Sequence, residues 1–244
     1  MITKKAIVIG ASSGIGKELA KVLADNNYEV GLVARRVKLL EDLSHQIDSK
    51  TYIKKIDICK YSEAKLSLEQ LIEEMGNVDL IVVNSGVRHS NPNLDFAKEK
   101  DTIDVNVAGF VNMAEVAINY FLKRGFGHLV GISSIAALVG SAKSPAYNAS
   151  KAFVSNYLWG LKQKVINSKI YITDIRPGLI NTPFVNNIKS RFWIETPQDA
   201  ARDIFKAIKR KKQIAYITER WSILAWLLKI LPENFCNYIY AKVK

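Results

Sequence analysis

Tyr147 and Lys151 stand four residues apart in the segment Tyr147-Asn148-Ala149-Ser150-Lys151. Residues at this spacing share one face of a helix. A free phenol has a pKa of about 10, which makes it a poor proton shuttle at neutral pH. An ammonium held beside it favours the phenolate and lowers that pKa. The pair therefore predicts an acid/base site, although the same spacing also occurs by chance on solvated helix faces.

A glycine-rich turn near the N-terminus gives this pair a context. Gly10-Ala11-Ser12-Ser13-Gly14-Ile15-Gly16 follows an apolar run at 6–9 and precedes a helical pattern. Glycines let the backbone approach a pyrophosphate closely, and the free N–H groups at the helix start favour its negative charge. The strand before and the helix after the turn favour a dinucleotide site over a plain tight turn.

The end of the next apolar run decides which dinucleotide is expected. An Asp or Glu usually stands there to bind the adenosine ribose of NAD. This chain has Arg35 and Arg36 instead, and the first carboxylate is Glu41. Guanidinium groups bind a 2′-phosphate that an acid would repel, so NADP(H) is favoured over NAD. The alternative is that both arginines are simply solvated.

Strand-like and helical patterns alternate along the chain, which predicts a parallel sheet with helices on both faces, a doubly wound α/β fold of about seven strands. The strand-like runs lack polar alternation, as expected of strands covered on both faces. They lie at 6–9, 30–34, 52–56, 80–83, 128–132, 170–175 and 214–218. Helical patterns cover a first segment through Ile15 and Leu23, then 38–48, 62–75, 96–123, 147–167 and 198–210.

We expect one catalytic domain over residues 1–218 and a helical extension over 219–244. The extension holds an apolar run at 221–231 that stops at Pro232 and an amphipathic piece at 235–243. Both are too short to span a bilayer. Three placements stay open: packing on the domain, packing on a second subunit, or lying in a membrane interface beside its lysines.

With these residues in place, the chain resembles the short-chain dehydrogenase/reductase family over roughly residues 3–218. The matching blocks follow the family's order along the chain, which chance explains poorly. They are Gly10…Gly14-Ile15-Gly16, Asp57-Ile58, Asn84-Ser85-Gly86, Asn106, Ser133-Ser134, Tyr147…Lys151 and Pro177-Gly178…Thr182.

The resemblance implies a catalytic or binding role for each of these residues. Tyr147 is the expected general acid/base and Lys151 its partner, which also binds the nicotinamide ribose. Ser134 polarises the substrate carbonyl, and Asn106 holds a water that links Lys151 to solvent, unless it only makes a backbone contact. The implied reaction is hydride transfer between NADP(H) and a carbonyl/secondary alcohol pair. The remaining cofactor contacts are Ser12, Ser13, Asp57, Ile58, Asn84, Ser85, Gly86, Pro177, Gly178, Ile180 and Thr182.

Two positions depart from the family pattern. Ile9 replaces a threonine that ties down the glycine turn, and Val83 replaces the first asparagine of Asn-Asn-Ala-Gly. Neither touches the reacting groups. A catalytically silent protein that senses nucleotides or acts as a scaffold is the alternative to an enzyme.

The substrate is expected to be a small apolar carbonyl or alcohol, because the segment after Thr182 is rich in apolar side chains that could form a lid over it. These side chains are Phe184, Val185, Ile188, Phe192, Trp193 and Ile194, with Lys189 and Arg191 among them. The alternative is that these side chains pack inward or on a neighbouring subunit. The resemblance also implies a homo-oligomer that pairs through the helices containing Asn106 and Tyr147.

Composition bears on whether the chain is a metal-binding, disulfide-rich, membrane-spanning or nucleic-acid-binding protein. The 244 residues are 48% hydrophobic and 24% charged, as in an ordinary folded domain. Two distant cysteines and three scattered histidines predict no metal site and no disulfide framework.

No signal-peptide pattern and no run of about 18 to 20 apolar residues is found, so a cytoplasmic enzyme is expected, or one held at the inner face of a membrane. The net charge of +12 comes without a nucleic-acid-binding motif, so no nucleic-acid partner is expected.

Overall fold

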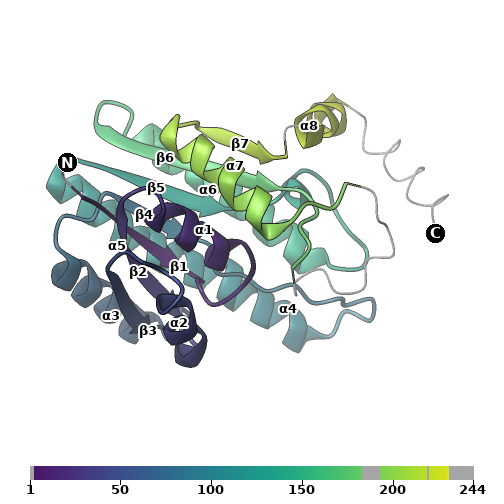
Figure 1. The fold of residues 1–244 in the computed structure, drawn as a ribbon. Helices are drawn as coiled ribbons and strands as arrows, with labels where there is room; N and C mark the ends of the chain where they lie inside the picture. The colour runs from purple at the N-terminus through teal and green to yellow at the C-terminus, as the bar shows by residue number, and fades with distance from the viewer. Residues whose placement is uncertain (1–2, 183–192, 219, 231–244) are drawn as a thin grey trace.

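The computed structural model describes residues 3–182, 193–218 and 220–230, and within them a parallel sheet forms the centre of the molecule. Its seven strands lie in the order β3-β2-β1-β4-β5-β6-β7 (Figure 1). All neighbouring strands pair in parallel. The strands are β1 (Lys4–Ile9), β2 (Tyr28–Ala34), β3 (Thr51–Lys55), β4 (Leu80–Val83), β5 (Phe126–Ile132), β6 (Lys169–Pro177) and β7 (Ile214–Ile217).

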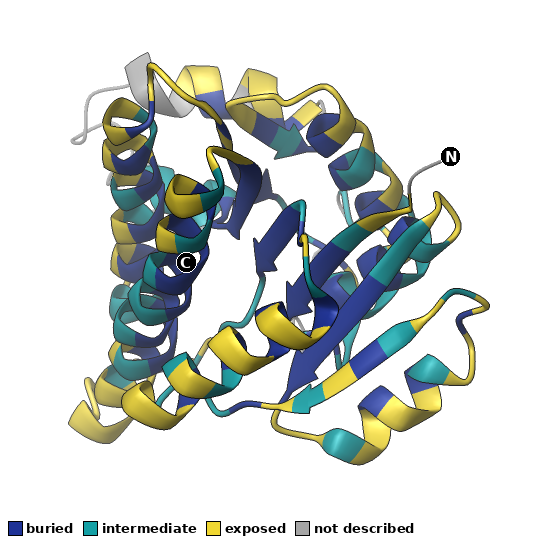
Figure 2. Ribbon diagram, turned by 90° about the vertical axis from the view of Figure 1, so that its left-hand side faces the viewer, coloured by how far each residue is buried: buried dark blue, intermediate teal, exposed yellow. Residues whose placement is uncertain are grey.

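Helices cover both faces of this sheet and seal two separate cores. One core joins the sheet to α1, α2 and α7, and the other joins it to α3, α5 and α6. The central strands are buried except at their first residues, whereas the helices are buried mainly on the side toward the sheet (Figure 2). The predicted doubly wound fold is therefore confirmed. The helices are α1 (Gly14–Ala24), α2 (Val37–Ser44), α3 (Tyr61–Met75), α5 (Phe110–Arg124), α6 (Pro145–Lys164) and α7 (Pro197–Lys209).

One helical stretch agrees with the predicted helical segment over 96–123 and contains a π-helical turn. From Phe96 to Arg124 the chain is continuously helical, through α4 (Phe96–Ile103), a π-helical turn (Asp104–Gly109) and α5. By length and composition alone this stretch is able to cross a bilayer, which the sequence analysis did not expect. Its apolar window is 56% buried within the protein, as in the core helix of a globular domain.

The C-terminal extension begins with one further helix, α8 (Arg220–Ile230). It contacts β7 and the short 3₁₀ helix η2 (Ile135–Leu138), and Trp221 and Ala225 are buried on its inner side. This side of the helix packs on the domain, which is one of the three placements considered. The predicted piece at 235–243 lies outside the described residues.

Candidate active site

The loops that leave the carboxyl ends of the strands surround a cavity of about 900 Å³. Ligands of open parallel sheets bind at this edge, where the order of strands along the chain reverses. Here that reversal lies between β1 and β4. Almost every predicted site residue lines the cavity; Gly16 and Asn106 do not. The lining includes Gly10, Ser12, Ser13, Gly14, Ile15, Arg35, Arg36, Asp57, Ile58, Asn84, Ser85, Gly86, Ser134, Tyr147, Lys151, Pro177, Gly178, Ile180 and Thr182.

The glycine turn is held by a side chain from the neighbouring strand. Asn84 Nδ2 donates a hydrogen bond of 3.0 Å to the Gly10 carbonyl oxygen. Gly16 is buried beneath the turn, where a Cβ would lie 2.2 Å from that same oxygen. Any side chain at this position would therefore displace the backbone of the turn. Asn84 ties down the turn in the absence of the threonine that Ile9 replaces.

A cationic group lies beside the turn. The Arg36 guanidinium donates hydrogen bonds to Ser12 Oγ at 2.8 Å and Ser13 Oγ at 2.9 Å. Arg35 is exposed and lines the same end of the cavity. Guanidinium groups, serine hydroxyls and the free N–H groups at the start of α1 are all suited to phosphate oxygens. This end of the cavity therefore fits a dinucleotide with an additional phosphate.

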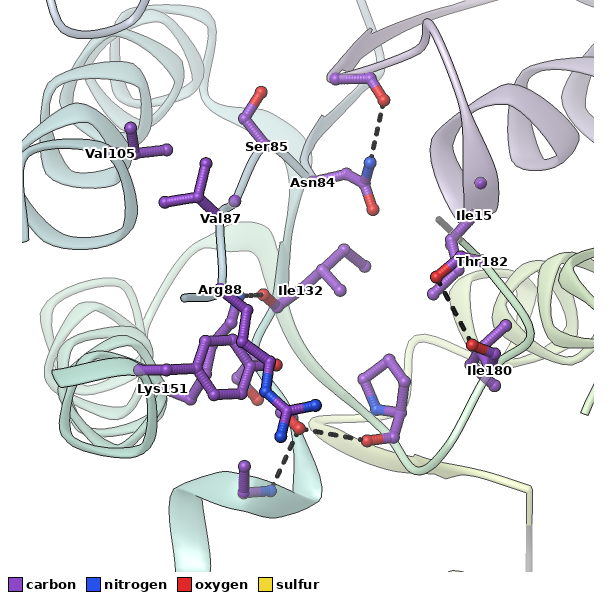
Figure 3. A pocket seen from close by; sticks show the side chains of 18 of the residues that line it. Ile15, Asn84, Ser85, Val87, Arg88, Val105, Ile132, Lys151, Ile180 and Thr182 are labelled. Atoms are coloured by element: carbon purple, nitrogen blue, oxygen red, sulfur yellow. Dashed lines mark hydrogen bonds between the residues drawn. The ribbon is translucent and has the colours of Figure 1, made fainter. Parts of the chain in front are cut away.

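The opposite wall of the cavity comes from the segment after β6. Figure 3 shows Ile180 and Thr182 across the cavity from Val87 and Val105. A Cβ on Gly14 would lie 3.1 Å from Thr182 Cγ2, so the segment reaches the start of α1. Of the apolar residues predicted to form a lid, Phe184, Val185, Ile188 and Phe192 lie outside the described residues.

Ser134 and Tyr147 are brought together by the 3₁₀ helix and α6. Ser134 Oγ accepts a hydrogen bond of 3.0 Å from the Ala136 N–H and donates one of 3.4 Å to the Pro177 carbonyl. It is also hydrogen-bonded to the Tyr147 side chain. Ser134, rather than Ser133, is therefore the serine that lies against Tyr147.

The pKa of Tyr147 differs from the sequence expectation. Burial raises the pKa of this phenol above its usual value, and the Ser134 hydrogen bond and the Arg88 guanidinium lower it by less. Lys151 Nζ lies 5.9 Å from the centre of the Tyr147 ring. In this structure desolvation outweighs the neighbouring cations, so the predicted lowering of the phenol pKa is not observed.

Lys151 is itself a buried cation. It is 5% exposed, and its Nζ donates a hydrogen bond of 3.0 Å to the Ile132 carbonyl oxygen. Burial lowers its pKa to about 8, and the negative charge of Asp174 acts in the opposite direction. Lys151 therefore loses its proton far more readily than an exposed lysine.

Asn106 lies behind the cavity wall. Its Oδ1 accepts a hydrogen bond of 2.8 Å from the Val87 N–H, and its Nδ2 donates to the Val87 carbonyl and to Ser150 Oγ. A Cβ on Gly86 would lie 3.3 Å from Asn106 Oδ1 and 3.4 Å from Lys151 Nζ, so both side chains converge there. The backbone contact is therefore present, whereas the water link to Lys151 stays a prediction. The π-helical turn around Asn106 is a feature often found at functional sites.

A buried ionic network of Asp174 and Arg176 holds the residue that precedes Ser134. Asp174 Oδ2 accepts a hydrogen bond of 2.7 Å from Arg176 Nε, and Asp174 Oδ1 accepts one from Ser133 Oγ. Arg176 also donates to Tyr216 Oη at 3.1 Å. Asp174 is fully buried and Arg176 nearly so. Because Ser133 directly precedes Ser134, this network braces the backbone that presents the Ser134 hydroxyl.

Arg88, His89 and Trp221 are among the cavity residues that were not predicted from the sequence. Arg88 and His89 follow the loop after β4, and Trp221 comes from α8. The Arg88 guanidinium lies 5.5 Å from the centre of the Tyr147 ring, and Figure 3 shows it reaching across the cavity. Its place in the loop that follows β4 and the Asn84-Ser85-Gly86 motif was the available signal for Arg88. No local pattern signals that Trp221 reaches the cavity.

Comparison with known proteins identifies a matching family, a related protein and similar solved structures. Residues 4–192 match the family described as short chain dehydrogenase. An oxidoreductase of Myxococcus xanthus is 30% identical over 240 residues, which is 96% of this chain and 94% of that protein.

Two solved structures share the fold. An alcohol dehydrogenase of Thermococcus sibiricus, complexed with 5-hydroxy-NADP, has a TM-score of 0.79 and 21% identity, covering 88% of this chain and 95% of that chain. A short-chain dehydrogenase of Sphingobium yanoikuyae, in complex with NADPH, has a TM-score of 0.80 and 19% identity, covering 94% and 97%.

The buried network leads to a prediction about stability. Asp174→Asn leaves Arg176 buried without its counter-charge, so we expect the free energy of unfolding to fall by about 3–5 kcal/mol. Urea denaturation followed by circular dichroism measures this. Asp203→Asn, which removes the solvent-facing partner of Lys206, is the control and should change stability little. Equal midpoints for both variants would contradict the role of the network.

Proposed function

The chain belongs to the short-chain dehydrogenase family and is an NAD(P)-dependent oxidoreductase, and we propose that it interconverts a carbonyl and a secondary alcohol with Tyr147 as general acid/base. The observation that carries this proposal is the hydrogen bond between Ser134 and Tyr147 at the wall of the cavity, with the Lys151 ammonium on the same helix. A catalytically silent protein has no need for a buried lysine with a lowered pKa in this position.

Ser134 and Tyr147 both act on the substrate oxygen, which receives the proton. Ser134 donates a hydrogen bond to the substrate oxygen and holds it near the Tyr147 hydroxyl. Tyr147 gives its proton to that oxygen during reduction and takes it back during oxidation. Arg88 and Lys151 place positive charge near the phenolate that forms. When bound, the nicotinamide supplies or accepts the hydride.

The substrate we propose is a small apolar carbonyl compound or alcohol. Beside Tyr147 the cavity is lined by apolar side chains of η2 and its flanking segments, together with Leu179 and Trp221. Such walls favour an apolar substrate held by a few polar groups. The η2 segment contributes Ile135, Ala136 and Val139.

Replacing the proposed acid tests the reaction. Tyr147→Phe removes the proton donor while it keeps the ring, so we expect NADPH oxidation with a panel of apolar ketones and aldehydes to fall at least ~100-fold. Tyr157→Phe on the same helix is the matched control and should retain activity. Undiminished turnover in Tyr147→Phe would exclude the assigned role. A parent protein that binds NADPH without turning over any carbonyl or alcohol would favour the silent alternative.

We further propose that NADP(H) is the preferred cofactor. Arg36 is held beside Ser12 and Ser13, and Arg35 lines the same end of the cavity, where an NAD-binding protein usually has a carboxylate. The Thermococcus sibiricus and Sphingobium yanoikuyae structures are complexes with an NADP derivative and with NADPH, which supports the same choice.

The arginines predict a measurable preference. NADPH should bind more tightly than NADH in fluorescence titrations. The double variant Arg35→Ala/Arg36→Ala should weaken NADPH binding about 10- to 100-fold, because charge-assisted hydrogen bonds to the extra phosphate are lost. NADH affinity should stay unchanged. Lys38→Ala removes a nearby cation outside the cavity and serves as the control. Equal affinities of the parent protein for both cofactors would overturn the arginine argument.

We also propose a homo-oligomer, which the apolar surface of α6 supports. Trp159 and Phe153 are exposed on this helix, and Phe153 stacks on Tyr157 with ring centres 5.9 Å apart. Large exposed aromatic side chains are typical of surfaces that bind another protein.

Light scattering tests the assembly. The parent protein should have a mass that is a multiple of 27.4 kDa, and Phe153→Asp/Trp159→Asp should lower it toward that of one chain. Leu66→Asp on α3 replaces an equally exposed apolar residue and should leave the mass unchanged. A parent protein that stays at 27.4 kDa at all concentrations would exclude the oligomer.

A further inference from the structure

The helix α8 has two unlike sides. Trp221 and Ala225, four residues apart, are buried against the domain, and Trp221 lines the cavity. A Cβ on Gly178 would overlap the Trp221 indole, so the glycine at the end of β6 leaves room for this ring. Trp193 packs on it edge-to-face, with ring centres 5.5 Å apart. The inner side of α8 is therefore anchored in the domain, and the orientation of the helix is set.

The outer side of the same helix carries large apolar side chains that are exposed to solvent. Ile223 is 66% exposed, Trp226 64% and Leu227 42%. Their spacing of three and four residues places them on one face, opposite Trp221 and Ala225. We call these three residues the outer face of α8. A buried inner side explains a helix that packs on a domain, but it does not explain this second apolar side.

Cationic side chains lie near the start of α8. Arg220 stands seven residues before Leu227 and therefore flanks the face on its edge. A groove beside the helix is lined by four cationic side chains, Lys206, Arg210, Lys212 and Arg220, and by two acidic ones, Glu195 and Asp203. The acids pair with Arg220 and Lys206. Arg210 and Lys212 take part in none of the ion pairs found among the described residues.

The sequence of α8 completes this pattern. Residues 220–230 contain Arg220 and Lys229 and no Asp or Glu. Tryptophan is favoured at the boundary between water and lipid, and basic residues beside it are attracted to anionic headgroups. An anionic lipid surface attracts a helix that carries apolar side chains and cations and no acid.

We propose that the outer face of α8 docks the enzyme on an anionic lipid bilayer, with Ile223, Trp226 and Leu227 inserted at the headgroup boundary and Arg210, Lys212 and Arg220 facing the headgroups. The helix lies along the surface and does not cross it, because its length is far below that of a spanning helix. Since Trp221 on the inner side lines the cavity, docking places the cavity beside the lipid surface.

Vesicle flotation of the full chain tests this proposal. The protein should float with phosphatidylcholine vesicles that contain phosphatidylserine and much less with pure phosphatidylcholine. Trp226→Ser/Leu227→Ser should reduce binding to the anionic vesicles at least tenfold, because two large apolar side chains are lost from the interface. Leu66→Ser, which removes an equally exposed apolar residue from α3, is the matched control and should bind as the parent does.

A second pair of variants tests the charge. Arg210→Glu/Lys212→Glu should weaken binding about fivefold or more for each residue and remove the preference for anionic vesicles. Lys98→Glu on α4 reverses an exposed cation elsewhere and is the control. All variants should retain NADPH oxidation without vesicles, which shows that the fold is intact.

Three outcomes would overturn the proposal. The parent protein stays with the unbound fraction, or Trp226→Ser/Leu227→Ser floats as the parent does, or this variant lowers the mass measured by light scattering. The last result would make the outer face an interface between copies of the chain.

Discussion

The parallel pairing of β1 with both β2 and β4 is the constraint on which the rest of the molecule depends. β1 lies at the point where the strand order reverses, so the turns after β1 and β4 diverge to opposite faces and leave a crevice between them. Asn84, directly after β4, is thereby placed to hold the Gly10 carbonyl. The same register aligns the ends of β5 and β6, which present Ser134 and Pro177.

Burial shapes the chemistry of the cavity more than its charges do. Desolvation raises the pKa of Tyr147, so the phenol stays protonated at neutral pH, and it lowers the pKa of Lys151 to about 8. Arg88 adds the positive charge that the sequence had assigned to Lys151 alone. The Asp174–Arg176 pair contributes differently, because it keeps a buried carboxylate near Lys151 and braces the segment of Ser134.

The extension after β7 links the site to the surface of the molecule. One side of α8 seals the cavity with Trp221, and the other exposes Trp226 and its apolar neighbours. α8 therefore joins the wall of the cavity to the exposed apolar face. α8 lies outside the segment that matches the family, because that segment ends at residue 192.

The sequence by itself determined the strands, the helices, the family and about half of the residues that line the cavity, because these follow from local periodicity and from motifs at strand ends. Only the tertiary structure decided that Tyr147 has a raised pKa, that Asn106 bonds Val87 and Ser150 in a π-helical turn, and that Arg88 and Trp221 reach the cavity. These features depend on burial and on contacts between segments far apart in the chain, such as Trp221 against Gly178. No spacing of residues along one segment encodes them.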